Sequence, residues 1–104
     1  MRLKELGATF IRLASKGWMQ VGTLQEAQGL EMLCPGCWAK NDGPIGTHVV
    51  VAWFRDRGVP NEAIPGPGRW AVSGTRIEDL TLMPSLLFDC WHGFVRDGGV
   101  VNAP

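Results

Sequence analysis

Three cysteines and two histidines are the residues of this chain that are best suited to bind a metal ion. Cys34 and Cys37 flank a Pro-Gly pair. This is the spacing of a zinc knuckle, in which a tight turn directs both sulfurs toward one point. Much later in the chain, Cys90 and His92 offer a third sulfur and a nitrogen. Together these four residues form a Cys₃His set, which is typical of closed structural zinc sites, and we expect one zinc ion per chain there.

His48 is the alternative fourth ligand. Cys90 and His92 are separated by one residue. On an ideal strand such residues lie about 7 Å apart, so both can reach one metal only if the chain turns at Trp91. Gly93 makes such a turn feasible. If His48 completes the site instead, His92 is free to act as a base.

A redox role for the Cys34–Cys37 pair is the competing interpretation of the two thiols. A redox CxxC normally opens a helix in a βαβ unit, whereas here glycines and a β pattern follow the pair. An odd number of cysteines also fits a disulfide framework badly. The pattern therefore favours a metal site.

The elements that must position these ligands are short strands. The chain has 14 glycines and 7 prolines, which cluster between runs of β-branched and aromatic residues. The predicted strands are 8–13, 29–34, 47–54, 69–74 and 93–101. Residues 23–29 carry helix capping signals and predict one short helix, and 55–69 predicts a long surface loop. We expect one domain, 1–104, that is mainly β, antiparallel and pinned by one zinc as in zinc ribbons, with at most one short helix.

Charge and hydropathy narrow the classes of partner. Ten Lys and Arg residues balance ten Asp and Glu residues, so no summed field attracts a polyanion and nucleic acid is not an expected partner. No segment approaches the roughly 18 apolar residues of a membrane span, and the N-terminus lacks the apolar stretch of a signal peptide. We expect a soluble protein of the cytoplasm.

Five tryptophans and no tyrosine are unusual for a chain of this length. Two or three of them can simply supply core bulk, since each buries a large area. Others could form the wall of a ligand site or an anchor at a protein interface. Trp53, Trp70 and Trp91, with Arg69 as a possible anion-binding group, are the candidate binding residues.

Three stretches together carry a resemblance to a known family: "EMLCPGCWAKNDGPIGTH", "PGPGRWAVSGTRIEDLTLMPS" and "CWHGFVRDGGV". They resemble a small family found in phages, prophages and bacterial genomes, some of whose relatives are encoded beside bacterial ubiquitin-like conjugation genes. The chain is also loosely similar to β-tent domains, in which two antiparallel sheets meet at an angle and a zinc bound by two knuckles pins them. This resemblance implies a fold and a zinc site, and it assigns no activity.

The sequence as a whole favours a non-catalytic, zinc-stabilised binding domain of phage-related origin, with a protein partner or a small ligand held at a tryptophan-rich surface. The alternative is a zinc-dependent hydrolase or other small metalloenzyme, which would need an open fourth position on zinc and a nearby base. The chain lacks the stronger catalytic signatures, such as HExxH or a P-loop.

Overall fold

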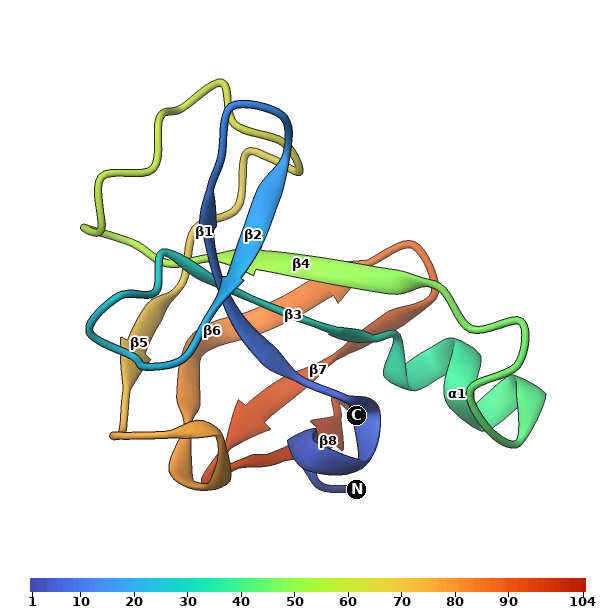
Figure 1. Cartoon of the computed structure of the whole chain (residues 1–104). Coiled ribbons are helices and arrows are strands. Elements are labelled where there is room, and N and C mark those ends of the chain that lie inside the picture. Colours follow the sequence, from blue (N-terminus) through green and yellow to red (C-terminus); the bar gives the residue numbers. More distant parts are fainter.

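The computed structural model describes residues 1–104 and is mainly β, as the sequence predicts. Eight strands form two antiparallel sheets of four strands each (Figure 1). The first sheet has the order β2-β1-β3-β4 and the second has the order β5-β6-β7-β8. The strands are β1 (Thr9–Leu13), β2 (Trp18–Val21), β3 (Gly29–Leu33), β4 (Val49–Trp53), β5 (Ala71–Ser73), β6 (Thr81–Phe88), β7 (Trp91–Arg96) and β8 (Gly99–Asn102).

Helical structure is confined to short segments. They are α1 (Pro35–Asn41) and two 3₁₀ turns, η1 (Leu3–Leu6) and η2 (Ile77–Asp79). None of them is long and apolar enough to cross a membrane. The helix expected over 23–29 is instead a turn, which Arg57 holds by donating from Nη1 to the carbonyls of Leu24 and Ala27 at 2.8 and 2.7 Å.

All five predicted strand regions contain strand, but the segment 93–101 spans two strands. Asp97 and Gly98 turn the chain between β7 and β8 with positive φ angles of 46° and 73°. The strands β2 and β6 were not predicted. The loop over 55–69 is confirmed between β4 and β5.

The main core lies between the two sheets. Phe10, Leu30 and Met32 of the first sheet and Leu82 and Leu86 of the second belong to one buried cluster. The 3₁₀ turn η1 adds two further buried leucines to this cluster. Its backbone joins the second sheet, since Leu3 N–H donates to the Gly98 carbonyl at 2.9 Å.

The strand β4 is buried on both faces, which explains its unbroken apolar sequence. Val50 and Ala52 belong to the core between the sheets, whereas Val51 and Trp53 form a second buried cluster with Ile11. The 55–69 loop reaches this second cluster, and its Ile64 carbonyl accepts a hydrogen bond from the Trp53 indole at 3.1 Å.

Gly29 is required beneath the Trp53 ring. The two residues are directly opposite each other in the β3–β4 register. A Cβ on Gly29 would lie 2.7 Å from the indole carbon Cε3 and 2.9 Å from the Ala52 carbonyl oxygen. These separations are below normal van der Waals contact, so a side chain here would displace Trp53 or the strand.

Gly29→Ala is therefore expected to lower the free energy of unfolding by about 1 to 3 kcal/mol, the usual cost of overpacking a core. Chemical denaturation followed by tryptophan fluorescence measures the change. Gly22→Ala is the matched control, because the nearest atom to its Cβ is 4.0 Å away. Equal stability of the two variants would contradict this packing.

Candidate metal centre

The chain brings three thiols and one imidazole together where the two sheets meet. Cys34, Cys37, His48 and Cys90 each offer one ligand atom, and these atoms all lie within 4.8 Å of one another. In a tetrahedral zinc site, bond lengths of about 2.0 to 2.3 Å place the ligand atoms about 3.5 to 3.8 Å apart. A contraction of at most about 1.3 Å would therefore seat an ion among these four residues.

The first two ligands are positioned by the start of α1. Cys34 is the residue that precedes the helix, Pro35 occupies its first position, and Cys37 follows in the first turn. Proline suits this position because its missing N–H has no partner in a helix and its φ is already helical. The expectation that a β pattern follows the knuckle is therefore wrong, since the CxxC pair opens a helix, although one outside a βαβ unit.

His48 is brought to the cluster by the pairing of β3 with β4. Leu33 is opposite Val49 in this ladder, so the next pair along is Cys34 with His48. The Cys34 N–H donates to the His48 carbonyl at 2.8 Å and extends the ladder by one step. Residues that are directly opposite in antiparallel strands place their side chains on the same face. The imidazole is thereby held beside the Cys34 sulfur.

Cys90 comes from the second sheet. It lies in the tight turn between β6 and β7, and its backbone carbonyl closely approaches Gly36 of the knuckle. A Cβ on Gly36 would collide with that carbonyl, so glycine is needed there for the second sheet to approach the first.

His92, the expected fourth ligand, lies outside this cluster and is replaced in it by His48. The strand β7 begins at Trp91, and strand alternation buries Trp91 while it exposes His92. The His92 Nε2 lies 3.2 Å from the Ser85 hydroxyl instead. The chain does not make the turn at Trp91 that binding by both Cys90 and His92 requires.

The cluster combines a buried and an exposed side. Cys34 is fully buried, Cys37 is half-buried, and His48 and Cys90 face solvent. All three cysteines are free of disulfides. A hydrogen bond with Cys90, burial and the neighbouring Cys34 raise the pKa of the Cys37 thiol to about 11. Reactive cysteines have a lowered pKa, so this direction disfavours a redox role, whereas a bound cation would favour the thiolates.

The four candidate binding residues have very different surroundings. Trp53 and Trp91 are buried, with 1% and 7% of their surface exposed, and cannot contact a partner. They are corrected to core residues, and their indole N–H groups donate to the Ile64 carbonyl and to Asn102 Oδ1. Trp70 is half-buried, and its indole N–H donates to the Ser85 carbonyl at 3.2 Å.

Arg69 is corrected to a structural residue of the 55–69 loop. Its guanidinium donates to the carbonyls of Pro60, Asn61, Ala63, Pro65 and Gly68 at distances of 2.7 to 3.5 Å. These bonds use the donors that an anion would need. The remaining donor, Nε, is buried without a hydrogen-bond partner.

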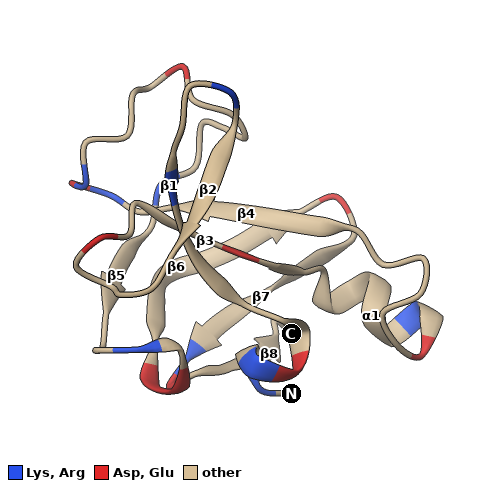
Figure 2. Cartoon of the chain, viewed as in Figure 1, with Lys and Arg blue, Asp and Glu red and all other residues tan.

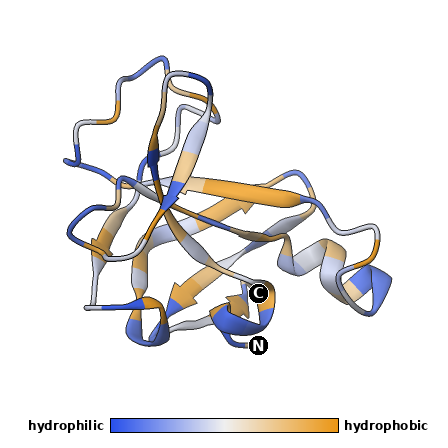
Figure 3. Cartoon of the chain, viewed as in Figure 1, coloured by the Kyte–Doolittle hydropathy of each residue, from blue (hydrophilic) through white to orange (hydrophobic).

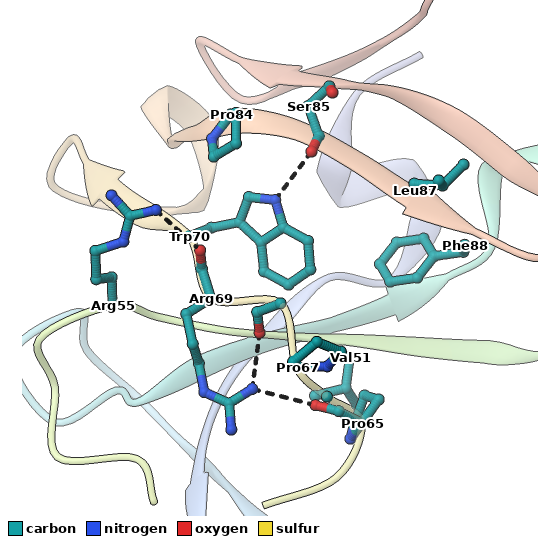
Figure 4. Close-up of a pocket in the computed structure, with 12 residues that line it drawn as sticks. Val51, Arg55, Pro65, Pro67, Arg69, Trp70, Pro84, Ser85, Leu87 and Phe88 are labelled. Carbon is teal, nitrogen blue, oxygen red and sulfur yellow. Dashed lines mark hydrogen bonds between the residues drawn. The ribbon is translucent and has the colours of Figure 1, made fainter. Parts of the chain in front are cut away.

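Two adjoining hollows extend from Trp70 to the metal cluster. One, of about 340 Å³, is lined by Trp70, Arg55 and the prolines of the loop (Figure 4). The other, of about 460 Å³, is lined by Trp18, His48 and Asp89. Five residues line both hollows: Val51, Pro65, Gly66, Leu87 and Phe88. We refer to the two hollows together as the Trp70 groove.

Replacing each histidine separately tests the ligand set. His48→Ala is expected to lose or loosen the metal, because it removes the only nitrogen ligand of the cluster. His92→Ala is expected to keep one metal ion per chain. Metal content by plasma emission, on protein purified without a histidine tag, measures both. Metal loss in the His92 variant with retention in the His48 variant would contradict the geometry.

Comparisons of the chain with protein-family models, curated proteins and solved structures find no match.

Proposed function

We propose that the chain is a non-catalytic, zinc-stabilised interaction domain whose Trp70 groove binds a protein partner or a small ligand. The observation that carries the proposal is the approach of four sulfur and nitrogen atoms, contributed by both sheets, to within 4.8 Å of one another. Three cysteines and one histidine provide the kind and the number of ligands that zinc requires, because structural zinc is four-coordinate and prefers thiolate and imidazole.

A structural role is favoured over a catalytic one by the number of protein ligands. Catalytic zinc sites keep three protein ligands and one position for water. Here His48 is in position to occupy the fourth site beside Cys34, which would leave no open place for water. The alternative, a zinc-dependent hydrolase, would require His48 to leave the cluster.

The free thiols also support a reducing compartment as the location of the domain. Zinc–thiolate sites form where cysteines stay reduced, so we place the domain in the cytoplasm of a bacterial host. The phage-related origin suggested by the sequence resemblance stays a prediction, and the proposed function does not depend on it.

The binding half of the proposal is supported by the apolar lining of the groove, to which the exposed Leu87 and the half-buried Phe88 contribute. Figure 2 shows acidic and basic residues scattered over the chain, with none on β4. Figure 3 shows β4 as a continuous hydrophobic strand. The Trp70 groove lies along this strand, and aromatic residues that line a concave apolar site are common in ligand and partner recognition.

Removing the metal is expected to unfold or greatly loosen the domain. The free energy of structural zinc binding is about 10 kcal/mol or more, which is comparable to the whole stability of a small domain. Thermal unfolding with and without a strong chelator, followed by the near-UV circular dichroism of the tryptophans, measures this. Cys90→Ser should unfold at a lower temperature even with excess zinc. Identical melting of the metal-loaded and metal-free chains would contradict a structural role.

A fragment set of apolar and aromatic carboxylic acids tests whether the groove binds ligands. The expected result is that amide chemical-shift changes in two-dimensional NMR are largest at Val51, Trp70 and Phe88. A third hollow beside Phe94 and Arg96, which has only Pro84 and Ser85 in common with the groove, serves as the internal comparison. Preferential shifts there, with none in the Trp70 groove, would count against the proposal.

A further inference from the structure

One edge of β4 has unpaired backbone groups that face the Trp70 groove. In an antiparallel ladder only every second residue directs its N–H and C=O groups toward a given neighbouring strand. The bonds from Cys34 N–H to His48 O and from Phe54 N–H to Gln28 O show that His48 and Phe54 are among the residues directed toward β3. Val49 and Val51 therefore direct their N–H and C=O groups away from β3. These four groups make no hydrogen bond within the chain. Val51 is also 96% buried, since only 4% of its surface is exposed.

This free edge is open at one end and closed at the other. At the closed end, Trp70 N–H donates to the Trp53 carbonyl at 3.0 Å, and Arg55 N–H donates to the Trp70 carbonyl at 2.7 Å. The two segments form a parallel bridge between Phe54 and Trp70. At the open end lie the exposed residues His48 and Asp89.

The opposite wall of the groove is a second free strand edge. β5 pairs only with Thr81–Met83 of β6, so the later part of β6 has no strand beside it on that side. Leu87 and Phe88 from this part line both hollows, and Leu87 is 72% exposed. The groove thus lies between two strand edges, with apolar side chains along both.

Arg55 is the only exposed charged group with free donors at the closed end, since the free Nε of Arg69 is buried. The Arg55 guanidinium makes one hydrogen bond, from Nη2 to the Arg69 carbonyl at 3.4 Å (Figure 4), and it has no carboxylate partner. No acidic residue lines this hollow. A ligand that reaches the closed end would therefore be favoured if it carried a carboxylate there.

We propose that the Trp70 groove binds the extended C-terminal segment of a partner polypeptide, which adds as a strand to the free edge of β4 and directs its terminal carboxylate toward Arg55. The inference rests on the proposed binding function and names the class of partner. Strand addition satisfies unpaired backbone groups at a strand edge and takes specificity from pockets for alternate side chains. Here the edge is exposed at Val49 and covered at Val51.

The bridge at the closed end and the positive charge of Arg55 together favour a partner segment that ends in the groove with its C-terminal carboxylate. An internal segment would have to continue past Trp70, where the bridge to β4 blocks the edge. A chain that ends there and enters from the His48 side runs parallel to β4, in the direction that the Trp70 segment already takes. Its side chains would alternate between solvent and the apolar wall of Phe88, Leu87 and the loop prolines.

The test uses metal-loaded protein and an array of hexapeptides that end in two apolar residues, each made as the free acid and as the amide. Free acids are expected to bind at least tenfold more tightly than the matched amides. Arg55→Gln should abolish that preference. Absence of binding by any peptide, or equal affinity of acids and amides, would overturn the inference.

A proline substitution tests strand addition itself. Val49→Pro removes an N–H that faces the groove and leaves the ladder to β3 intact, which edge strands tolerate. It is expected to weaken peptide binding at least tenfold. Gln20→Pro is the matched control, because it removes an outward N–H from β2 at the far edge of the same sheet. Both variants are checked for metal content and thermal unfolding.

If Val49→Pro fails to fold, amide hydrogen exchange of Val51 in the unaltered protein decides the matter, with at least tenfold slowing expected on peptide saturation. Unchanged exchange would overturn the inference. Carboxylic-acid fragments that shift groove residues while no peptide binds would refute strand addition and leave the proposed binding function standing. Absence of zinc from the protein would refute the proposed function on its own ground.

Discussion

Two of the junctions between the sheets of this chain lie at the ends of the Trp70 groove, and the cysteine–histidine cluster is one of them. Cys34, Cys37 and His48 belong to the segment between β3 and β4, whereas Cys90 belongs to the turn between β6 and β7. The other junction is the backbone bridge between Phe54 and Trp70. A metal ion in the cluster would convert a contact between two surface turns into a set of coordinate bonds. Its binding free energy then becomes part of the free energy of folding.

The Trp70 groove runs from one junction to the other. His48 and Asp89 line it near the cluster, and Trp70 and Arg55 line it near the bridge. Its walls belong to different sheets, so its width depends on how the sheets are held together. A metal ion in the cluster and a ligand in the groove would therefore be coupled through the separation of β4 from β6. A bound metal ion would fix the shape of the groove.

The sequence predicts the fold class and three of the four residues of the candidate metal cluster because these depend on local patterns. Cysteine spacing is explicit in the chain, and runs of β-branched residues bounded by glycine predict strands. The fourth ligand depends on strand register instead. His48 lies beside Cys34 because Leu33 pairs with Val49. The two strands are separated in the sequence by α1 and the turn after it, so no local pattern predicts their register.

The other differences between sequence and structure also arise from contacts between distant parts of the chain, which local patterns do not show. β6 was not predicted because Pro84 is typical of a turn, yet it lies at the register shift between Leu82 and Leu86, where a proline is tolerated. Trp53 and Trp91 were candidate binding residues because composition does not reveal burial. Arg69 was a candidate anion site because a sequence does not show the five carbonyls that surround its guanidinium.

Anomalous diffraction at the zinc absorption edge, on crystals of the purified protein, would determine the identity and the ligands of the metal. We expect one anomalous peak per chain, bonded to the sulfurs of Cys34, Cys37 and Cys90 and to a ring nitrogen of His48. A peak bonded to His92, a zinc with water in place of His48, or no peak among the three sulfurs would contradict this expectation.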